Sequence, residues 1–313
     1  MKKIKLLIIG NSSFVKRRVI PSLKKNKKIK YCICSKSSKI DSNNKILYNN
    51  YQDALKDFKP ELVYVSTINP LHFGYAKKIL KKGFNLIVDK PVAPNLKKTK
   101  ELLKIAKEKK LFFAEATLFN YHRIFVVIKK LCGSISKVNH IQSNLNHPLT
   151  RTIKEVKKIQ GDCESDMSVY AAAILRLFTK NKITNLHVNR NYFKNTNVVK
   201  NFYITSSSKD CTYFGNFALQ KEYTQQIIFY TKDKIIYSPQ RIFALPFNKD
   251  LELIVKTKNK IKKIKVKKDD CIGNFFKLSL NAIKDKKYNF FYNIMLEDAI
   301  IRSNIKNYWL KLN

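Results

Sequence analysis

Short apolar runs alternate with longer amphipathic segments along the first part of the chain. The runs lie in KIKLLIIG, which ends on Gly10, in KIKYCICSKS, and at residues 62–66, 84–88 and 111–114. Each run has the length of a buried strand, and helical patterns such as that of residues 96–109 lie between them. Strands that alternate with helices over about 120 residues predict a doubly wound, Rossmann-type parallel sheet.

The pattern changes to period two after a helical segment that contains Tyr170. The later runs are alternating or rich in β-branched and aromatic residues, and they lie at 140–148, 186–193, 201–208, 211–219, 224–239 and 251–268. They predict a large, mostly antiparallel open sheet with one packed and one wet face, followed by a helix from about Asn293. We therefore expect an α/β chain with a Rossmann domain at 1–121 and an α+β domain at 122–313.

The loop after the first strand retains part of the G-x-G-x-x-G pattern that binds dinucleotides. Gly10 holds its first position, whereas Ser12 and Val15 replace the other two glycines. Gly10 permits the tight turn, and the backbone N–H groups and hydroxyls that follow suit a pyrophosphate at a helix N-terminus. We expect this loop to contact a cofactor through Gly10, Asn11, Ser12, Ser13 and Phe14.

The second strand ends on Ser35 and Lys36, with no acidic residue beside them. Enzymes that prefer NAD usually carry Asp or Glu near this position to accept hydrogen bonds from the ribose 2′-OH. A serine donor and a lysine charge suit a 2′-phosphate instead. The pair therefore favours NADP(H), although NAD(H) remains possible.

Two further loops follow predicted strands, where ligands of open parallel sheets bind. The segment NLIVDKPVAPN places Lys90 after a strand, where an ammonium group can polarise a carbonyl and Pro91 fixes the backbone. Read alone, this pair is also compatible with a solvated turn, and His72 in the preceding loop with an interior or surface residue. The residues expected at the cofactor are Ser66, Thr67, Asn69, His72, Asp89, Lys90 and Pro91.

The order of these motifs resembles the Gfo/Idh/MocA family of NAD(P)-dependent oxidoreductases. The segments that carry the resemblance are STINPLH, DKPVAPN, EATLFNYHRIF and KKIQGDCESDMSVY. Asp89-Lys90-Pro91 stands where the family has Glu-Lys-Pro, and Asn120 stands where arginine is common. The resemblance implies a substrate site formed by Lys90, Glu115, His122, Asp166 and Tyr170.

The resemblance also implies roles for the two catalytic candidates, Lys90 and Tyr170. In related enzymes the residue at the position of Tyr170 protonates the carbonyl oxygen. Asp166 and Tyr170 lie four residues apart on a predicted helix, so they share one face. The alternative is that Tyr170 is a boundary residue of an amphipathic helix.

The block YFGNFALQKEYTQQIIFYTKDKIIYSPQRIFALP is similar to a stretch in family members that act on nucleotide-linked sugars. It implies hydride transfer between NADP(H) and a keto or hydroxyl carbon of such a sugar, with the second domain binding substrate and forming a homo-oligomer through its sheet. Two alternatives remain. One is an NAD-dependent sugar dehydrogenase, and the other is a non-enzymatic regulator that senses dinucleotide or sugar, which the degenerate glycine loop motivates.

Composition adds few constraints. The formal charge of +41 comes from 55 Lys and only 8 Arg, spread through both halves, whereas a selected nucleic-acid binder should be richer in arginine. We therefore expect no specific nucleic-acid partner. The apolar runs are too short for a membrane span, and the scattered cysteines and histidines predict no metal site. A reduced, cytoplasmic protein is the expectation.

Overall fold

The computed structural model describes residues 3–43, 45–133, 137–179, 183, 185–219 and 221–307. The chain divides into two compact units. The first unit contains Met1–Ala116 and Ile272–Leu296, and the second contains Thr117–Cys271 and Glu297–Asn313. Residues 272–296, which the sequence analysis places in the second domain, thus cluster with the first unit.

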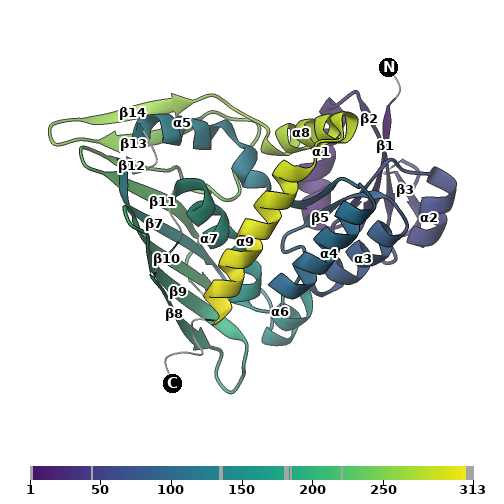
Figure 1. The fold of residues 1–313 in the computed structure, drawn as a ribbon, viewed down its shortest axis with the longest axis horizontal. Coiled ribbons are helices and arrows are strands. Elements are labelled where there is room, and N and C mark those ends of the chain that lie inside the picture. The colour runs from purple at the N-terminus through teal and green to yellow at the C-terminus, as the bar shows by residue number, and fades with distance from the viewer. Residues whose placement is uncertain are drawn as a thin grey trace. The chain divides into compact units, whose positions relative to one another are not determined.

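The first unit is built on a six-stranded sheet with the order β3-β2-β1-β4-β5-β6. All neighbouring strands are parallel, and helices connect them (Figure 1). This is the Rossmann strand order, so the predicted doubly wound sheet is confirmed. The strands are β1 (Ile4–Ile9), β2 (Ile29–Cys34), β3 (Ile46–Tyr48), β4 (Leu62–Val65), β5 (Asn85–Asp89) and β6 (Phe113–Ala116), and the helices are η1 (Val15–Val19), α1 (Ile20–Lys25), α2 (Tyr51–Phe58), η2 (Asn69–Leu71), α3 (His72–Lys81) and α4 (Leu96–Glu108).

Two late helices, α8 (Cys271–Asp285) and α9 (Asn289–Asn307), bring the chain back to the first unit. The ring of Phe276 packs edge-on against Tyr64 of β4 at 6.0 Å between centroids. The hydroxyl of Tyr292 donates a hydrogen bond to the carbonyl oxygen of Leu111. These aromatic contacts explain why the segment clusters with the first unit, a return that local sequence patterns do not reveal. Helix α9 begins at Asn289 rather than near Asn293.

The second unit contains an eight-stranded sheet with the order β14-β13-β12-β11-β7-β10-β9-β8. Strands β7 and β10 are parallel, and the other neighbours are antiparallel. The predicted large, mostly antiparallel sheet is confirmed. The strands are β7 (Val138–His147), β8 (Asn185–Tyr192), β9 (Val199–Ser207), β10 (Thr212–Leu219), β11 (Thr224–Thr231), β12 (Ile235–Tyr237), β13 (Leu251–Lys256) and β14 (Ile261–Val266), and the helices are η3 (Leu118–Tyr121), α5 (Arg123–Cys132), α6 (Ile153–Ile159) and α7 (Cys163–Phe178).

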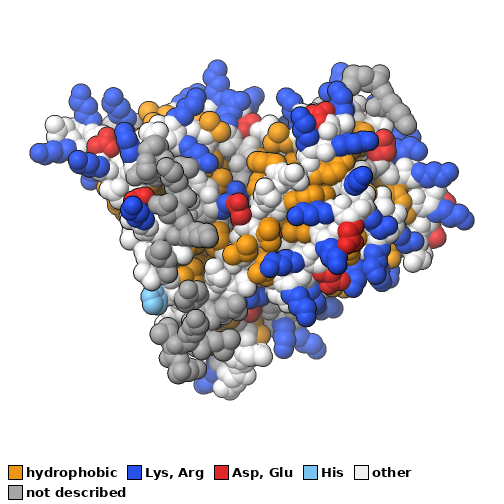
Figure 2. Space-filling model, in the orientation of Figure 1, with side chains coloured by type: hydrophobic (Ala, Val, Ile, Leu, Met, Phe, Trp, Pro, Cys, Tyr) orange, Lys and Arg blue, Asp and Glu red, His pale blue; other side chains and the backbone are white. Residues whose placement is uncertain are grey.

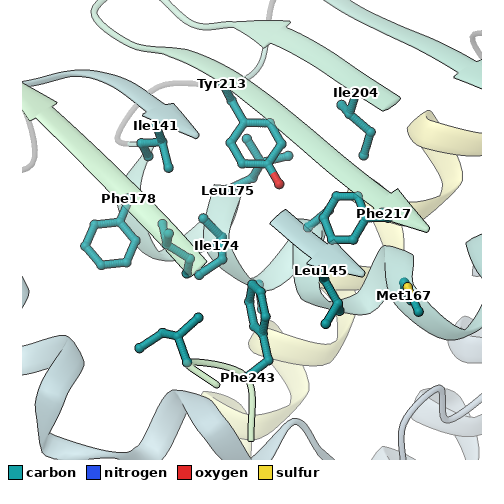
Figure 3. Close-up of a cluster of buried hydrophobic side chains, with 14 of the residues drawn as sticks. Ile141, Leu145, Met167, Ile174, Leu175, Phe178, Ile204, Tyr213, Phe217 and Phe243 are labelled. Atoms are coloured by element: carbon teal, nitrogen blue, oxygen red, sulfur yellow. The ribbon is translucent and has the colours of Figure 1, made fainter. Parts of the chain in front are cut away.

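Helix α7 covers one face of this sheet, and its buried side chains form the core of the second unit with those of the strands (Figure 3). Phe178 packs against Phe229 at 4.5 Å between ring centroids. The buried Tyr213 hydroxyl lies 2.6 Å from the Ser143 hydroxyl, which satisfies the polar tip of an otherwise apolar side chain. This core fixes α7, and therefore the side chains on its partly exposed face.

Lys and Arg side chains are scattered over the visible face of the molecule, among hydrophobic and acidic ones (Figure 2). All six cysteines are buried thiols. Within the described part of the chain, no helix is long and apolar enough to cross a membrane, and no group of His, Cys, Asp or Glu has the arrangement of a metal site.

Candidate functional site

Gly10 makes the turn between β1 and the first helix in a conformation that requires glycine. Its φ is +110°, and a Cβ atom added there would lie 2.1 Å from the carbonyl oxygen of Ser66. The backbone cannot move aside easily, because the Ser66 N–H donates to the Ile9 carbonyl at 2.8 Å and the Gly10 N–H donates to the Cys34 carbonyl at 2.9 Å. Gly10 thus allows the loop to pass close to the end of β4, which is the first role predicted for it.

The end of β2 carries a small hydroxyl and amide cluster. The Ser35 hydroxyl donates to the Ser38 hydroxyl at 3.0 Å, and the Asn11 amide donates to the same oxygen at 3.0 Å. Ser35 is buried, whereas Lys36 is exposed. The structure therefore brings together Asn11 and Ser35, as predicted, and adds Ser38, which the sequence analysis did not single out.

Asp89 at the end of β5 accepts hydrogen bonds from two hydroxyl groups. Tyr64 donates to one carboxylate oxygen and Ser66 to the other, and the Ser12 hydroxyl lies 3.2 Å from that of Ser66. Burial raises the pKa of Asp89, while the hydrogen bonds from Ser66 and Tyr64 lower it. Burial and the nearby Asp89 carboxylate also raise the pKa of Tyr64 well above its usual range. The glycine loop is thereby connected to the Lys90 loop through Ser12 and Ser66.

The Lys90–Pro91 loop is held through its backbone. The peptide bond between Lys90 and Pro91 is cis. The Pro91 carbonyl oxygen lies 2.9 Å from Nδ1 of His72, and the Val92 N–H donates to the carboxylate of Glu115 at 2.6 Å. His72 and Glu115 are both buried. Two of the predicted site residues therefore support this loop from beneath, and Lys90 itself is half-buried at the end of β5.

The remaining residues predicted in the first unit lie around the same strand ends. Thr67 and Asn69 are half-buried in the loop after β4, and the Thr67 carbonyl lies 3.1 Å from Nε2 of His72. Phe14 is exposed and precedes η1. Tyr64 was missed at this site, although a tyrosine within an aliphatic buried strand needs a partner for its hydroxyl and is a usable signal.

Tyr170 lies on α7 within a group of aromatic rings in the second unit. The Phe119 and Phe243 ring centroids lie 5.5 and 5.0 Å from that of Tyr170, and 5.3 Å from each other. Tyr170 and Asp166 are both half-buried and lie one helical turn apart. The helix begins after the N-cap Asp162, whose carboxylate accepts from the Ser165 N–H at 2.6 Å. The phenol is thus fixed by packing at a partly exposed position.

His122 has a defined tautomer at the N-terminus of α5. Its Nδ1 accepts a hydrogen bond from the Ile124 N–H at 3.1 Å, so in the neutral ring the proton is on Nε2. Burial lowers the pKa of His122, and the neighbouring Asp269 opposes that shift. Among the described residues, neither this Nε2 nor the buried side-chain oxygen of Asn120 has a hydrogen-bond partner. A buried donor and a buried acceptor therefore lie close in sequence beside the phenol-bearing unit's aromatic group.

A family model for oxidoreductases with an NAD-binding Rossmann fold matches residues 4–117. The N-terminal domain belongs to the Gfo/Idh/MocA oxidoreductase family. Trans-1,2-dihydrobenzene-1,2-diol dehydrogenase of Xenopus laevis is 25% identical over 133 residues, which are 42% of this chain and 40% of that protein. The dTDP-3,4-didehydro-2,6-dideoxy-alpha-D-glucose 3-reductase of Streptomyces violaceoruber is 24% identical over 132 residues, 41% of this chain and 38% of that one.

The chain thus aligns with less than half of the length of these curated Gfo/Idh/MocA relatives. A solved structure covers nearly all of it. The 3-ketoreductase KijD10 from Actinomadura kijaniata, in complex with TDP-benzene and NADP, matches with a TM-score of 0.88 at 16% identity, covering 98% of both chains. The whole described chain therefore has the two-domain fold of this family.

Proposed function

We propose that this chain is an NADP(H)-dependent oxidoreductase that reduces a keto group of a nucleotide-linked sugar. The observation that carries the proposal is the Lys90 loop at the carboxyl end of β5, whose backbone is held by His72 and Glu115. This is the edge of a parallel sheet where ligands bind. The fold shared with a 3-ketoreductase solved with NADP and TDP-benzene supports the substrate class.

The first unit has the groups that a dinucleotide needs. Gly10 forms the tight turn, and η1 has no acidic residue in its first turn. The N–H groups of residues 11–13 therefore suit a pyrophosphate without competing negative charge. Ser35 and Lys36 suit a 2′-phosphate, which is why we assign NADP(H) rather than NAD(H). When bound, its nicotinamide supplies the hydride.

Lys90 and Tyr170 act on the carbonyl oxygen of the sugar. As the carbonyl carbon is reduced, the electron pair of the C=O π bond moves to the oxygen. The Lys90 ammonium stabilises the negative charge that develops there, and the Tyr170 hydroxyl gives its proton to the oxygen to form the alcohol. Both groups lower the barrier by acting in the transition state rather than by binding the ground state.

His122 and Asp166 are assigned to substrate binding, because each offers a polar group in the unit that contains Tyr170. The Nε2–H of His122 is a buried donor with no acceptor among the described residues, and a sugar hydroxyl would satisfy it. Glu115 acts differently from the sequence expectation, since its carboxylate holds the Val92 N–H. We assign Glu115 to fixing the Lys90 loop.

We also propose that the chain forms a homo-oligomer through the outer face of the eight-stranded sheet. Charged residues make up 27% of the chain, yet the outward alternate positions of the four central strands carry none. A face without charges in such a basic chain favours burial against a second copy. These positions are His140, Gln142, Asn144, Asn146, Asn201, Tyr203, Thr205, Ser207, Thr212, Phe214, Asn216, Ala218, Thr224, Gln226, Ile228 and Tyr230.

The test is NADPH oxidation followed with a panel of keto nucleotide sugars, free keto sugars and no sugar. Oxidation only with the nucleotide-linked substrates supports the proposal. Reduction of NAD⁺ by sugar alcohols without any reductase activity would favour a dehydrogenase. Ligands that raise thermal stability but give no turnover in either direction would favour a regulator.

A further inference from the structure

His72 contacts two carbonyl oxygens from different loops. Its Nδ1 lies 2.9 Å from the Pro91 oxygen and its Nε2 lies 3.1 Å from the Thr67 oxygen, while the residue is only 1% exposed. A neutral imidazole has one N–H, so its other nitrogen would place a lone pair against a carbonyl oxygen. The imidazolium form donates to both oxygens and leaves no buried acceptor unpaired with a donor.

The charges around His72 suit a cation. The groups that face this region are Asp89 and Lys90 from the end of β5, Glu115 from β6 and the Tyr64 hydroxyl from β4. Burial raises the pKa of Asp89, and His72 is among the neighbours that lower it. With His72 protonated, two cations offset the two carboxylates. With His72 neutral, one carboxylate would lack a compensating charge in a poorly solvated region.

We propose that His72 is protonated on both ring nitrogens and acts as the positioning residue for Lys90. It ties the loop after β4 to the loop after β5 by donating to one carbonyl in each. Lys90 directly precedes Pro91, so this bond limits where the ammonium group points. The structural part stands by itself, and the catalytic consequence rests on the proposed reductase function.

The protonation state is tested by nitrogen NMR of the histidine rings in the full chain at pH 7. The His72→Gln variant identifies the His72 signals by their loss. Two signals of the protonated type for His72 support the proposal. One protonated and one unprotonated nitrogen would overturn it, whether or not the protein turns over a sugar.

The positioning role is tested with His72→Gln, because glutamine has the size to fill the site but donates from one end only. We expect kcat to fall by roughly 10²-fold, as for a small displacement of a reacting group, while the Kd of NADPH and KM change less than about threefold. Hydrogen exchange at the Val92 amide should rise in the same variant.

The matched control is His140→Gln in the second unit, where Nδ1 lies 2.8 Å from the Thr212 hydroxyl. It should leave kcat and Val92 exchange unchanged. Unchanged kcat and Val92 exchange in His72→Gln would overturn the positioning role. If the wild-type chain has no reductase activity, the Val92 exchange result still decides whether His72 holds the loop, and only the proposed function fails.

Discussion

Replacing Gly10 with alanine should destabilise the first unit much more than the same change at Gly83. Both glycines have positive φ, +110° and +84°, but a Cβ at Gly83 meets nothing within 4 Å, whereas at Gly10 it meets the Ser66 oxygen at 2.1 Å. Backbone strain costs of order 1–3 kcal/mol at either position. Overpacking adds about 1–3 kcal/mol at Gly10 alone.

The difference between the two variants isolates the steric contact. We expect about 2 kcal/mol, which corresponds to roughly a 30-fold larger unfolding constant for Gly10→Ala. Urea unfolding with probes in the first unit measures it, and hydrogen exchange at the β1 and β4 amides locates it. Equal destabilisation by Gly10→Ala and Gly83→Ala would refute the argument that the β1 turn requires glycine because it passes against Ser66.

Three further predictions concern cofactor choice, pH and assembly. NADPH should bind more tightly than NADH, and Lys36→Asp should reverse this preference in a fluorescence titration, whereas equal wild-type affinities would contradict the assignment. Because burial raises the pKa of Asp89 above its ordinary 3.8, its contribution to stability is present below pH 3.8 and is lost as pH rises through the raised value; Asp89→Asn should flatten this fall in equilibrium unfolding, and the exposed Asp57→Asn should not. Asn144→Lys on the outer sheet face should reduce the mass measured by light scattering, and an unchanged oligomer would exclude that face.

The strands of both sheets follow from the sequence, because a buried strand leaves a local apolar or alternating pattern. Gly10 is also visible locally, since it follows the first apolar run where a tight turn is needed. The short β3 and the helix α2 left too little periodic signal. Helices α8 and α9 illustrate a different limit, because contacts such as Phe276 with Tyr64 join segments far apart in the chain.

The candidate site was predictable in its residues more than in their roles. Lys90 lies at the predicted strand end. His72 and Glu115 instead hold the backbone on the far side of the same loop. A sequence shows that a polar residue follows a strand, but whether its side chain meets a ligand or a carbonyl depends on contacts across the sheet. Tyr64 and Ser38 were missed for the same reason.

Single-turnover NADPH oxidation with a 3-keto nucleotide sugar tests the central claim, that Lys90 and Tyr170 serve one carbonyl oxygen. Lys90→Met and Tyr170→Phe should each lower the rate by roughly 10²-fold or more, with little change in NADPH affinity. The double variant should lose less than the product of the two single losses, because both groups act in one transition state. Tyr203→Phe, on the outer sheet face, is the matched control and should keep the wild-type rate. A near-wild-type rate in Tyr170→Phe, or fully multiplicative losses in the double variant, would contradict the account.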